Sequence, residues 1–576
     1  MAATTSNKKR KQNQASVRLI IMAAILVCVN ILASYFHTGL DLTHEKRFTL
    51  SPSTKKLLGN MHEVAVFDIY LDGENFPAAL QRMQEAIRER LRSFKDIAGD
   101  KVQFRFVDPM AGKTDAEKKQ VAEEMRLKGM SYFNLRNNDE SDYSIKVFYP
   151  YALLHYNGKE VPVMLLEDPP GKTFEEKLSY AEATLEYKFA SAINQLNRHD
   201  VKRIAYITGN EEPLGVSTMD MLMTLPRYYS VDTIDLTRVA SISRLYDAII
   251  IHHPETPFTG PEKLKIDQYV MHGGHVLWAL STLRTSLDSF AHTPQFLALD
   301  YALDLDDLLF KYGVRINNDL VEDMQCAKIG RVENNYQTEL KPWIYFPLFN
   351  PTGQHPIVRN MDFLLGGFTN TIDTLKTAGI SKTVLLATSK YSRSSRAPLR
   401  VSLSATNYEP RPEMFPKHYL PTAILLEGTF HSAYNGLLAP DFLRYLSDSL
   451  KMPFKPVCDS PNSMIVVSSQ DMFTNLYTTK DGVLPMGYSR WTGEFYTNKN
   501  FLLNCLEYLT DNSGILESRS KEVRLRLLDG ARAKDEKATW EIVNIVVPVV
   551  VVLVFASVFL FFRKRRYEKR ADKPTI

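Results

Sequence analysis

Two short polar sequences, each following an apolar run, contain the residue types best suited to chemistry in this chain. Asn210-Glu211-Glu212 comes after the run 204–208, and His252-His253-Pro254-Glu255 comes after the run 248–251. Neighbouring glutamates could act as a general acid and a general base, and imidazole rings are common zinc ligands. Either chemistry would require these side chains to converge at one place in the fold.

The histidines lack the spacing of a metal site. His252 and His253 are adjacent and would point in opposite directions at a strand end, while His272 and His275 flank a glycine turn. Neither polar sequence contains the Gly-x-Ser-x-Gly pattern, or its cysteine analogue, that presents a nucleophile on a strand-to-helix elbow. We therefore expect no metal and no catalytic residue, and we interpret both sequences as parts of a ligand pocket. The pocket candidates are Asn210, Glu211, Glu212, His252, His253 and Glu255.

The tripeptide Gly171-Lys172-Thr173 is similar to the end of a phosphate-binding loop, but Leu166 stands where the first glycine of that loop belongs. Thr173 and Glu176 instead have the spacing of a capping box, which predicts the start of a helix. The chain also lacks a Gly-x-Gly-x-x-Gly sequence. We expect no cofactor, and any ATP used with this protein would be bound by another chain.

The elements that would position the pocket repeat in the order strand, loop, helix. This alternation is typical of a doubly wound parallel sheet, in which ligands bind at the carboxyl ends of the strands. Residues 300–460 are less periodic and are interpreted as an insertion, after which a strand and a helix return to the sheet. The predicted strands are Ile204–Thr208, Val231–Leu236, Ala248–Ile251, His275–Leu280 and Met464–Ser468, and the predicted helices are 259–273 and Asn500–Leu509.

An α/β domain is predicted before this sheet. The strands Val64–Leu71 and Val102–Val107 enclose an amphipathic helix, and such a βαβ unit implies a parallel pair. Asn157-Gly158 is a strong hairpin signal, and the strands Tyr149–Leu154 and Val161–Leu166 flank it. We expect this domain to be thioredoxin-like. The apolar face of its first helix consists of Leu80, Met83, Ile87, Leu91 and Phe94.

Two hydrophobic spans, 19–36 and 542–562, enclose most of the chain. A helix rises about 1.5 Å per residue and a bilayer core is roughly 30 Å thick, so both spans can cross a membrane. Basic residues precede the first span at 8–11 and follow the second at 563–570, and such flanks are retained in the cytoplasm. We expect a two-pass protein of a bacterial inner membrane, with both termini cytoplasmic and the large region between the spans in the periplasm. A cleaved signal peptide is the alternative for the first span.

Composition excludes several classes of function. The net charge of +4 owes much to the two basic tails, so the exterior region offers no electrostatic case for binding nucleic acid. Its three cysteines, Cys326, Cys458 and Cys505, are too few for a disulfide framework. At most one pair could form, and we expect all three to be free. The predicted segments are a basic tail 1–18, a span 19–36, an α/β domain 37–199, a doubly wound domain 200–515, a juxtamembrane segment 516–541, a span 542–562 and a basic tail 563–576.

Several segments without any catalytic motif have a specific sequence. They are Lys46–Pro52, Leu303–Leu309 with Tyr312-Gly313-Val314, His355-Pro356-Ile357 with Asn360, Tyr496–Asn504, and Arg519–Asp529 leading to Asn544 and Pro548. Together they resemble the gliding motility-associated ABC transporter auxiliary proteins, the gliding motility protein G family, over nearly the whole chain. The second domain is similar to one that this family shares with an intraflagellar transport subunit and an oligosaccharyltransferase subunit. That domain is related to the glutamine amidotransferase sheet but lacks its nucleophile.

The resemblance implies a non-enzymatic subunit that works with a separate ABC permease and a cytoplasmic ATPase in gliding motility and protein secretion. A chain held at both ends must work beside its permease, so the juxtamembrane segment is expected to contact permease or lipid headgroups. Two other functions stay open, an envelope glycan-binding module and, after it, a hydrolase of amidotransferase ancestry. A secreted protein is a further candidate partner. The contact candidates are Arg519, Lys521, Arg524, Arg526 and Trp540.

Overall fold

The computed structural model describes residues 49–72, 76–128, 130, 132–136, 145–167, 173–197, 201–291, 293–332, 338–351, 353–450, 452–479, 482–511, 513–520 and 536–571, with positions 21, 22, 24, 25, 27 and 28. The chain divides into two units, Met1–Val523 and Arg524–Ile576. The first unit contains two α/β parts, and each is built on its own sheet.

The first part is a four-stranded sheet with the order β2-β1-β5-β6. The parallel pairing of β1 with β2 confirms the predicted βαβ unit, and the antiparallel β5 and β6 confirm the hairpin. Asn157 and Gly158 have φ values of 50° and 70°, the left-handed conformation that a tight hairpin turn requires. The elements are α2 Pro52–Gly59, β1 Ala65–Ile69, α3 Ala78–Ala98, β2 Val102–Phe106, α4 Asp115–Leu127, β3 Phe133–Arg136, β4 Ile145–Phe148, β5 Tyr151–Tyr156, β6 Lys159–Met164 and α5 Phe174–Asn197.

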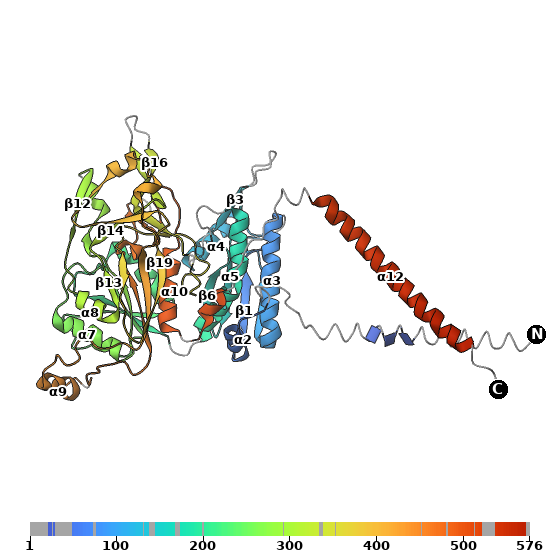
Figure 1. Ribbon diagram of the computed structural model, residues 1–576, viewed down its shortest axis with the longest axis horizontal. Coiled ribbons are helices and arrows are strands. Elements are labelled where there is room, and N and C mark those ends of the chain that lie inside the picture. The colour runs from blue at the N-terminus through green and yellow to red at the C-terminus, as the bar shows by residue number, and fades with distance from the viewer. Residues whose placement is uncertain are drawn as a thin grey trace, which may run out of the picture. The chain divides into compact units, whose positions relative to one another are not determined.

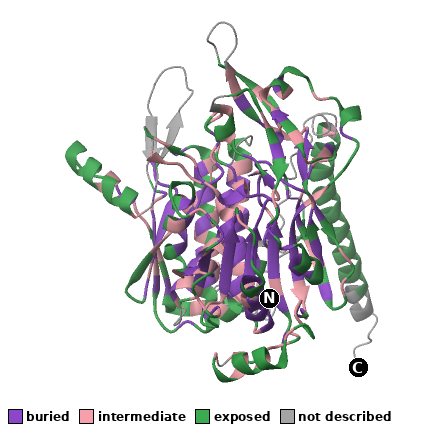
Figure 2. Ribbon diagram, turned by 90° about the vertical axis from the view of Figure 1, so that its left-hand side faces the viewer, coloured by how far each residue is buried: buried purple, intermediate pink, exposed green. Residues whose placement is uncertain are grey.

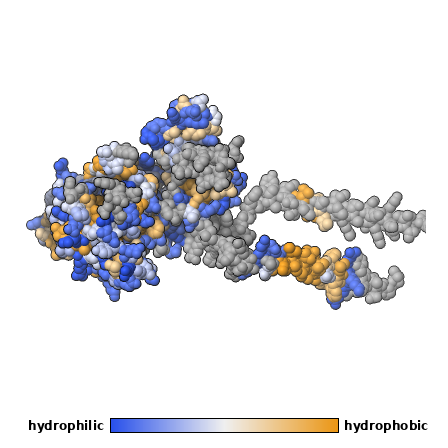
Figure 3. Space-filling model, turned by 90° about the horizontal axis from the view of Figure 1, so that it is seen from above, coloured by the Kyte–Doolittle hydropathy of each residue, from blue (hydrophilic) through white to orange (hydrophobic). Residues whose placement is uncertain are grey.

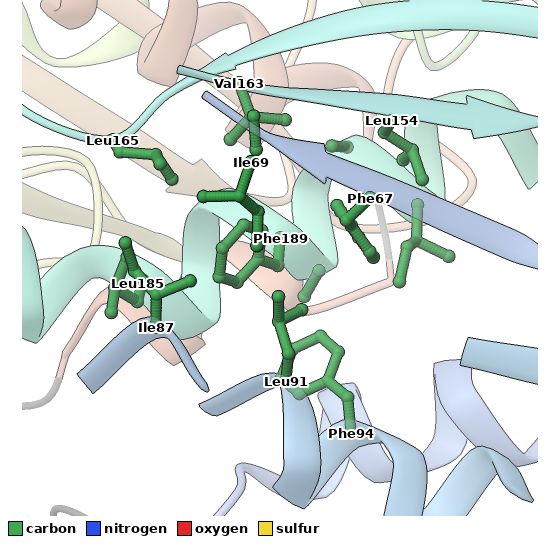
Figure 4. Close-up of a cluster of buried hydrophobic side chains, with 14 of the residues drawn as sticks. Phe67, Ile69, Ile87, Leu91, Phe94, Leu154, Val163, Leu165, Leu185 and Phe189 are labelled. Carbon is green, nitrogen blue, oxygen red and sulfur yellow. The ribbon is translucent and has the colours of Figure 1, made fainter. Parts of the chain in front are cut away.

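The core of this part lies between the sheet and the helices α3 and α5. Phe189 of α5 points toward Phe67 of β1, with ring centroids 5.1 Å apart, and toward Phe94 of α3 at 6.3 Å (Figure 4). The apolar positions predicted on α3 are all buried. The predicted capping box also forms at the start of α5, where the Thr173 amide donates to Glu176 Oε2 at 2.8 Å.

The second part is a seven-stranded sheet with the order β19-β22-β23-β10-β9-β7-β8. The strands β8, β7, β9, β10 and β23 are parallel, as the repeat of strand and helix predicted. Buried residues concentrate in β7, β9, β10 and β23, whereas β8 is mostly exposed or half-buried, and the purple strands of Figure 2 lie at the centre of the molecule. A hydrophobic core covers each face of the sheet. The elements are β7 Arg203–Thr208, α6 Met219–Thr224, β8 Ser230–Asp235, β9 Ala248–His252, α7 Gly260–Met271, β10 His275–Ala279, α8 Asp306–Tyr312, β19 Ile380–Ala387, β22 Pro421–Gly428, α9 Pro440–Asp448, β23 Asn462–Val467 and α10 Asn498–Thr510.

The interpretation of residues 300–460 as an insertion is wrong for two of its strands. β22 pairs with β23 and β19 pairs with β22, so both extend the main sheet in the antiparallel sense. The run 422–426 is buried at every position, and a strand buried on both faces has no polar alternation to reveal it. The smaller sheets around it are formed by β11 Leu283–Arg284, β12 Gln295–Asp300 and β21 Leu399–Ser402; β13 Val314–Ile316 and β18 Ile372–Thr374; β14 Asp319–Asp323 and β20 Ser392–Arg396; and β15 Cys326–Val332, β16 Thr338–Phe349 and β17 Leu364–Leu365.

The two ends of this region meet on helix α5. Near its start, the Ser51 amide donates to the buried Glu186 carboxylate at 2.7 Å. Near its end, the short helix η8, Ile515–Ser520, places Ile515 in the core of the first part. A Cβ atom at Gly514 would lie 3.9 Å from that of Ser53, so the chain enters and leaves this region at neighbouring points.

The second unit contains the helix α12, Lys537–Ala571. Its segment Thr539–Arg565 is long and apolar enough to cross a membrane, and it is the one such helix among the described residues. Figure 1 shows α12 as one long helix, and in Figure 3 its middle is hydrophobic and its ends are hydrophilic. Of the first predicted span, only positions 21, 22, 24, 25, 27 and 28 are described, and these are helical. The rest of the span lies outside the described residues.

Candidate functional site

A cavity of about 820 Å³ lies at the carboxyl ends of the parallel strands of the large sheet. The loops after β7, β9, β10 and β23 contribute to its wall, together with β12 and the segment 485–491. Its size is that of a pocket for a small organic ligand. The side chains discussed below are Glu211, His253, Glu255, Arg284, Asp288, Phe296, Tyr301, Phe346, Gln470, Asp471, Tyr488 and Trp491.

Three of the six pocket candidates line this cavity, namely Glu211, His253 and Glu255. Glu211 and His253 have φ values of 61° and 52°, in the left-handed region that few non-glycine residues adopt and in which histidine is more frequent than glutamate. Such backbone strain occurs at ligand sites when the surrounding structure holds it in place. Burial lowers the pKa of His253 to about 4, so its imidazole is neutral at pH 7.

The other three candidates, Asn210, Glu212 and His252, are buried outside the cavity wall. His252 is fully buried, which lowers its pKa to about 3, and its Nε2 lies 2.9 Å from the carbonyl oxygen of Gln470. A carbonyl only accepts, so Nε2 carries the proton and donates. His252 therefore positions the backbone of Gln470.

Glu212 is a buried carboxyl without a cationic partner among the described residues. The backbone N–H of Asn210 donates to Glu212 Oε2 at 2.8 Å, while Glu212 Oε1 has no hydrogen-bond partner among the described residues. Burial is the main reason that its pKa rises to about 7, and the neighbouring Glu262 and Asp235 raise it further. Glu212 is thus placed to hold a proton near neutral pH.

The variant Glu212→Gln is expected to change how stability depends on pH. The folded-state pKa of Glu212 exceeds its ordinary 4.5, so the folded protein binds this proton more tightly than the unfolded chain. The contribution of Glu212 to stability should therefore fall by roughly 2–3 kcal/mol as pH rises from 4.5 to 7. Glutamine stays neutral, so urea unfolding of the full chain in detergent should show the variant gaining stability over wild type between pH 5 and pH 8. An equal difference at both pH values would contradict this assignment.

Two residues absent from the sequence-based candidates, Gln470 and Asp471, follow β23 and line the cavity. Gln470 is 2% exposed; its amide Nε2 donates to the carbonyl oxygen of Thr285 at 3.0 Å, while its Oε1 has no partner among the described residues. The Asp471 side chain lies against Gly367, where a Cβ atom would come within 2.7 Å of Oδ2. Asp471 is partly exposed on the concave wall, and desolvation by the surrounding protein raises the pKa of its carboxyl to about 7.

Among the described residues, no serine or threonine hydroxyl of the cavity wall is hydrogen-bonded to His253, the imidazole of that wall. The hydroxyl of Ser463 lies 3.0 Å from Nδ1 of His275, but both residues are at the amino ends of their strands, opposite the cavity. Asp247, the carboxylate near that pair, already accepts from Lys202 and from the Arg203 amide. The four cysteines are free, as predicted for the three exterior ones.

The membrane-proximal candidates are only partly described. Arg519 belongs to η8, whereas Lys521, Arg524 and Arg526 lie outside the described residues. Trp540 lies in the first turn of α12, exposed, and its indole N–H donates to Glu536 Oε2 at 3.0 Å.

These features are those of an accessory protein with a ligand-sized cavity and a helix of membrane-spanning length. Residues 201–505 match the family model described as "ABC-type uncharacterized transport system". This match covers more than half of the chain, and the chain belongs to that family. The protein is an auxiliary component of an ABC-type transport system.

Other comparisons add less. Residues 44–155 match a domain of unknown function, DUF7088. A protein of Borreliella burgdorferi, described as "Uncharacterized protein", is 22% identical over 97% of this chain and 99% of its own length. The solved structure of the "mmIFT52 N-terminal domain" is 14% identical and covers 54% of this chain and 98% of its own, with a TM-score of 0.31.

Proposed function

We propose that the protein is a non-enzymatic, doubly anchored subunit of an ABC transporter complex that serves gliding motility and protein secretion. Its large region lies in the periplasm, beside the permease, and couples permease movement to an envelope substrate or presents that substrate. Both termini are cytoplasmic. The first α/β part is thioredoxin-like in this proposal, and the second is a relative of the amidotransferase sheet.

The observation that supports the two-pass arrangement is that the two ends of the region between the spans, near Ser51 and Ile515, meet on α5. Ser51 binds Glu186 at the start of the region, and Ile515 packs into the same core at its end. Two membrane helices leaving from neighbouring points can enter one patch of bilayer without stretching the folded region between them. The basic flanks at 8–11 and 563–570 support cytoplasmic termini.

Purification of the full chain in mild detergent tests the proposal. We expect a permease and an ATPase to accompany it, and neutralising Arg519, Lys521, Arg524 and Arg526 with glutamine should lower their yield. Four glutamines at Lys95, Lys118, Lys119 and Arg126 change the charge equally on exposed positions of α3 and α4 and are the matched control. Purification without either partner would refute the complex, and equal yields from both variants would refute the contact assigned to the juxtamembrane segment.

A second function, an envelope glycan-binding module, is favoured by the aromatic rings of the cavity. Tyr301, Tyr488 and Trp491 all line it, and flat rings beside polar groups suit sugar faces. A glycan array probed with the full chain in nanodiscs tests this function. Retention of a neutral glycan that is lost in Trp491→Ala would support it, and the absence of any retained glycan would refute it.

A further inference from the structure

The wall of the large cavity contains hydrogen-bond acceptors that the described protein leaves without donors. Gln470 donates its amide N–H to Thr285, and this bond fixes its Oε1 as an unpartnered acceptor. The adjacent Asp471 lines the same wall, and no hydrogen bond or ion pair of its carboxylate occurs among the described residues. A ligand that satisfies both groups must bring donors.

The charges around the cavity favour a cation. Its wall contains four acidic side chains, of which Asp471 has a pKa raised to about 7, and a single guanidinium, that of Arg284, while His253 is neutral. The guanidinium lies over the ring of Tyr301 at 5.7 Å from the centroid. The four acidic side chains are Glu211, Glu255, Asp288 and Asp471.

An organic cation fits this wall better than a metal ion. Among the described residues, no group of three or more His, Cys, Asp or Glu side chains is placed to hold a metal. The wall instead carries apolar and aromatic surface, which can cover the hydrocarbon part of a ligand and attract a positive charge to the ring faces. These side chains are Phe296, Phe346, Tyr488 and Trp491.

We propose that this cavity binds an organic ligand through a primary amino group. The ammonium group donates to the Asp471 carboxylate and to Gln470 Oε1, and the hydrocarbon part lies against the aromatic side chains. His252 positions the site by holding the Gln470 backbone. The inference does not depend on the transporter complex, since it rests on the cavity alone.

Binding to the full chain in lipid nanodiscs tests the proposal, with two amine probes and their neutral partners. Cadaverine represents a free amine and is compared with the diol of the same length. The peptide acetyl-Gly-Lys-Gly-amide represents a lysine side chain and is compared with its Nζ-acetylated form. We expect at least one amine to bind saturably, and its neutral partner to bind roughly tenfold more weakly or not at all, because an ammonium–carboxylate hydrogen bond is lost. The probe that binds distinguishes the two sources of the amine.

The variant Asp471→Asn keeps the shape of the side chain and removes its charge. It should weaken amine binding by roughly tenfold or more, while Asp373→Asn, which affects a surface ion pair with Arg315, should leave binding unchanged. The thermal stability of Asp471→Asn should equal or exceed that of wild type, because the variant removes a partly enclosed carboxyl that has no protein counter-charge. If Asp471 instead stabilised the fold, Asp471→Asn would lower the thermal stability.

Three results would overturn the proposal. They are the absence of saturable binding by either amine, equal binding of an amine and its neutral partner, and undiminished binding in a folded Asp471→Asn variant. Equal binding of the diol would point to a neutral hydroxyl ligand, such as a sugar, in the same cavity.

Discussion

Replacing Glu186 by alanine is expected to lower the free energy of unfolding of the first α/β part by about 3–5 kcal/mol, because one partner of a buried ion pair is removed. The Glu186 side chain is fully buried and lies 3.5 Å from the guanidinium of Arg90, which is 12% exposed. The same carboxylate accepts the Ser51 amide at 2.7 Å. Alanine would leave the guanidinium without this counter-charge and the amide without this acceptor.

Two further variants separate these contributions. Glu186→Gln keeps an oxygen that can accept from Ser51 but removes the charge, so its loss should be intermediate. Glu182→Ala, one turn earlier on α5, affects a more exposed ion pair with Arg82 and should cost less than about 1 kcal/mol. Urea unfolding of the full chain, followed by hydrogen exchange in α5, measures all three. If Glu186→Ala and Glu182→Ala lowered the free energy of unfolding equally, the assignment of Glu186 as the residue that holds Ser51 would be wrong.

Replacing Trp278 by alanine is expected to destabilise the second part by about 3–5 kcal/mol, because a fully buried aromatic side chain is lost from the core. Trp278 lies in β10, with strands hydrogen-bonded on both sides. It packs in the core that also contains Tyr269 and Leu308. The cavity is expected to lose its ligand together with the sheet, because β10 leads into the cavity wall.

The variant Trp278→Phe is the matched control for this site. The indole N–H of Trp278 has no hydrogen-bond partner among the described residues, so phenylalanine removes an unsatisfied donor together with part of the ring. We expect Trp278→Phe to lower the free energy of unfolding by about 1 kcal/mol, since the loss of ring packing and the removal of an unsatisfied donor have opposite effects. Thermal unfolding monitored by tryptophan fluorescence and by circular dichroism compares the variants. A loss in Trp278→Phe as large as in Trp278→Ala would mean that the N–H does stabilise the fold.

The parts of the fold that the sequence predicted are those with local signals. The apolar stripe of α3, the capping box of α5 and the turn at Asn157-Gly158 each lie within a few residues and depend on geometry that short segments determine. The strands β19 and β22 have no such signal. The place of β22 beside β23, and of β19 beside β22, depends on pairing between segments that are distant in the sequence. The continuously buried run of β22 also resembles other apolar runs.

The difference between local signals and long-range pairing also explains which residues of the site could be predicted. The end of β7 supplies Glu211 and the end of β9 supplies His253 and Glu255, and the order of strands and helices indicated both positions. Gln470 and Asp471 also follow a predicted strand, so the same rule could have found them. The missing information was that β23 pairs with β10, which precedes it by nearly two hundred residues. Glu211 lines the cavity and the adjacent Glu212 does not. This choice depends on the conformation of the loop, so it could not be predicted from the sequence.

The meeting of the two ends of the region 51–515 on α5 has a mechanical consequence if each end leads to a membrane anchor. A pull between the two anchors would load Ser51, α5 and η8. Helix η8 places Ile515 in the core of the first part and Leu516 in a core of the seven-stranded sheet, so the force would reach both parts at this short helix. The same strain would be felt at the contacts between α5 and α10, such as the hydrogen bond from Tyr187 to Glu507.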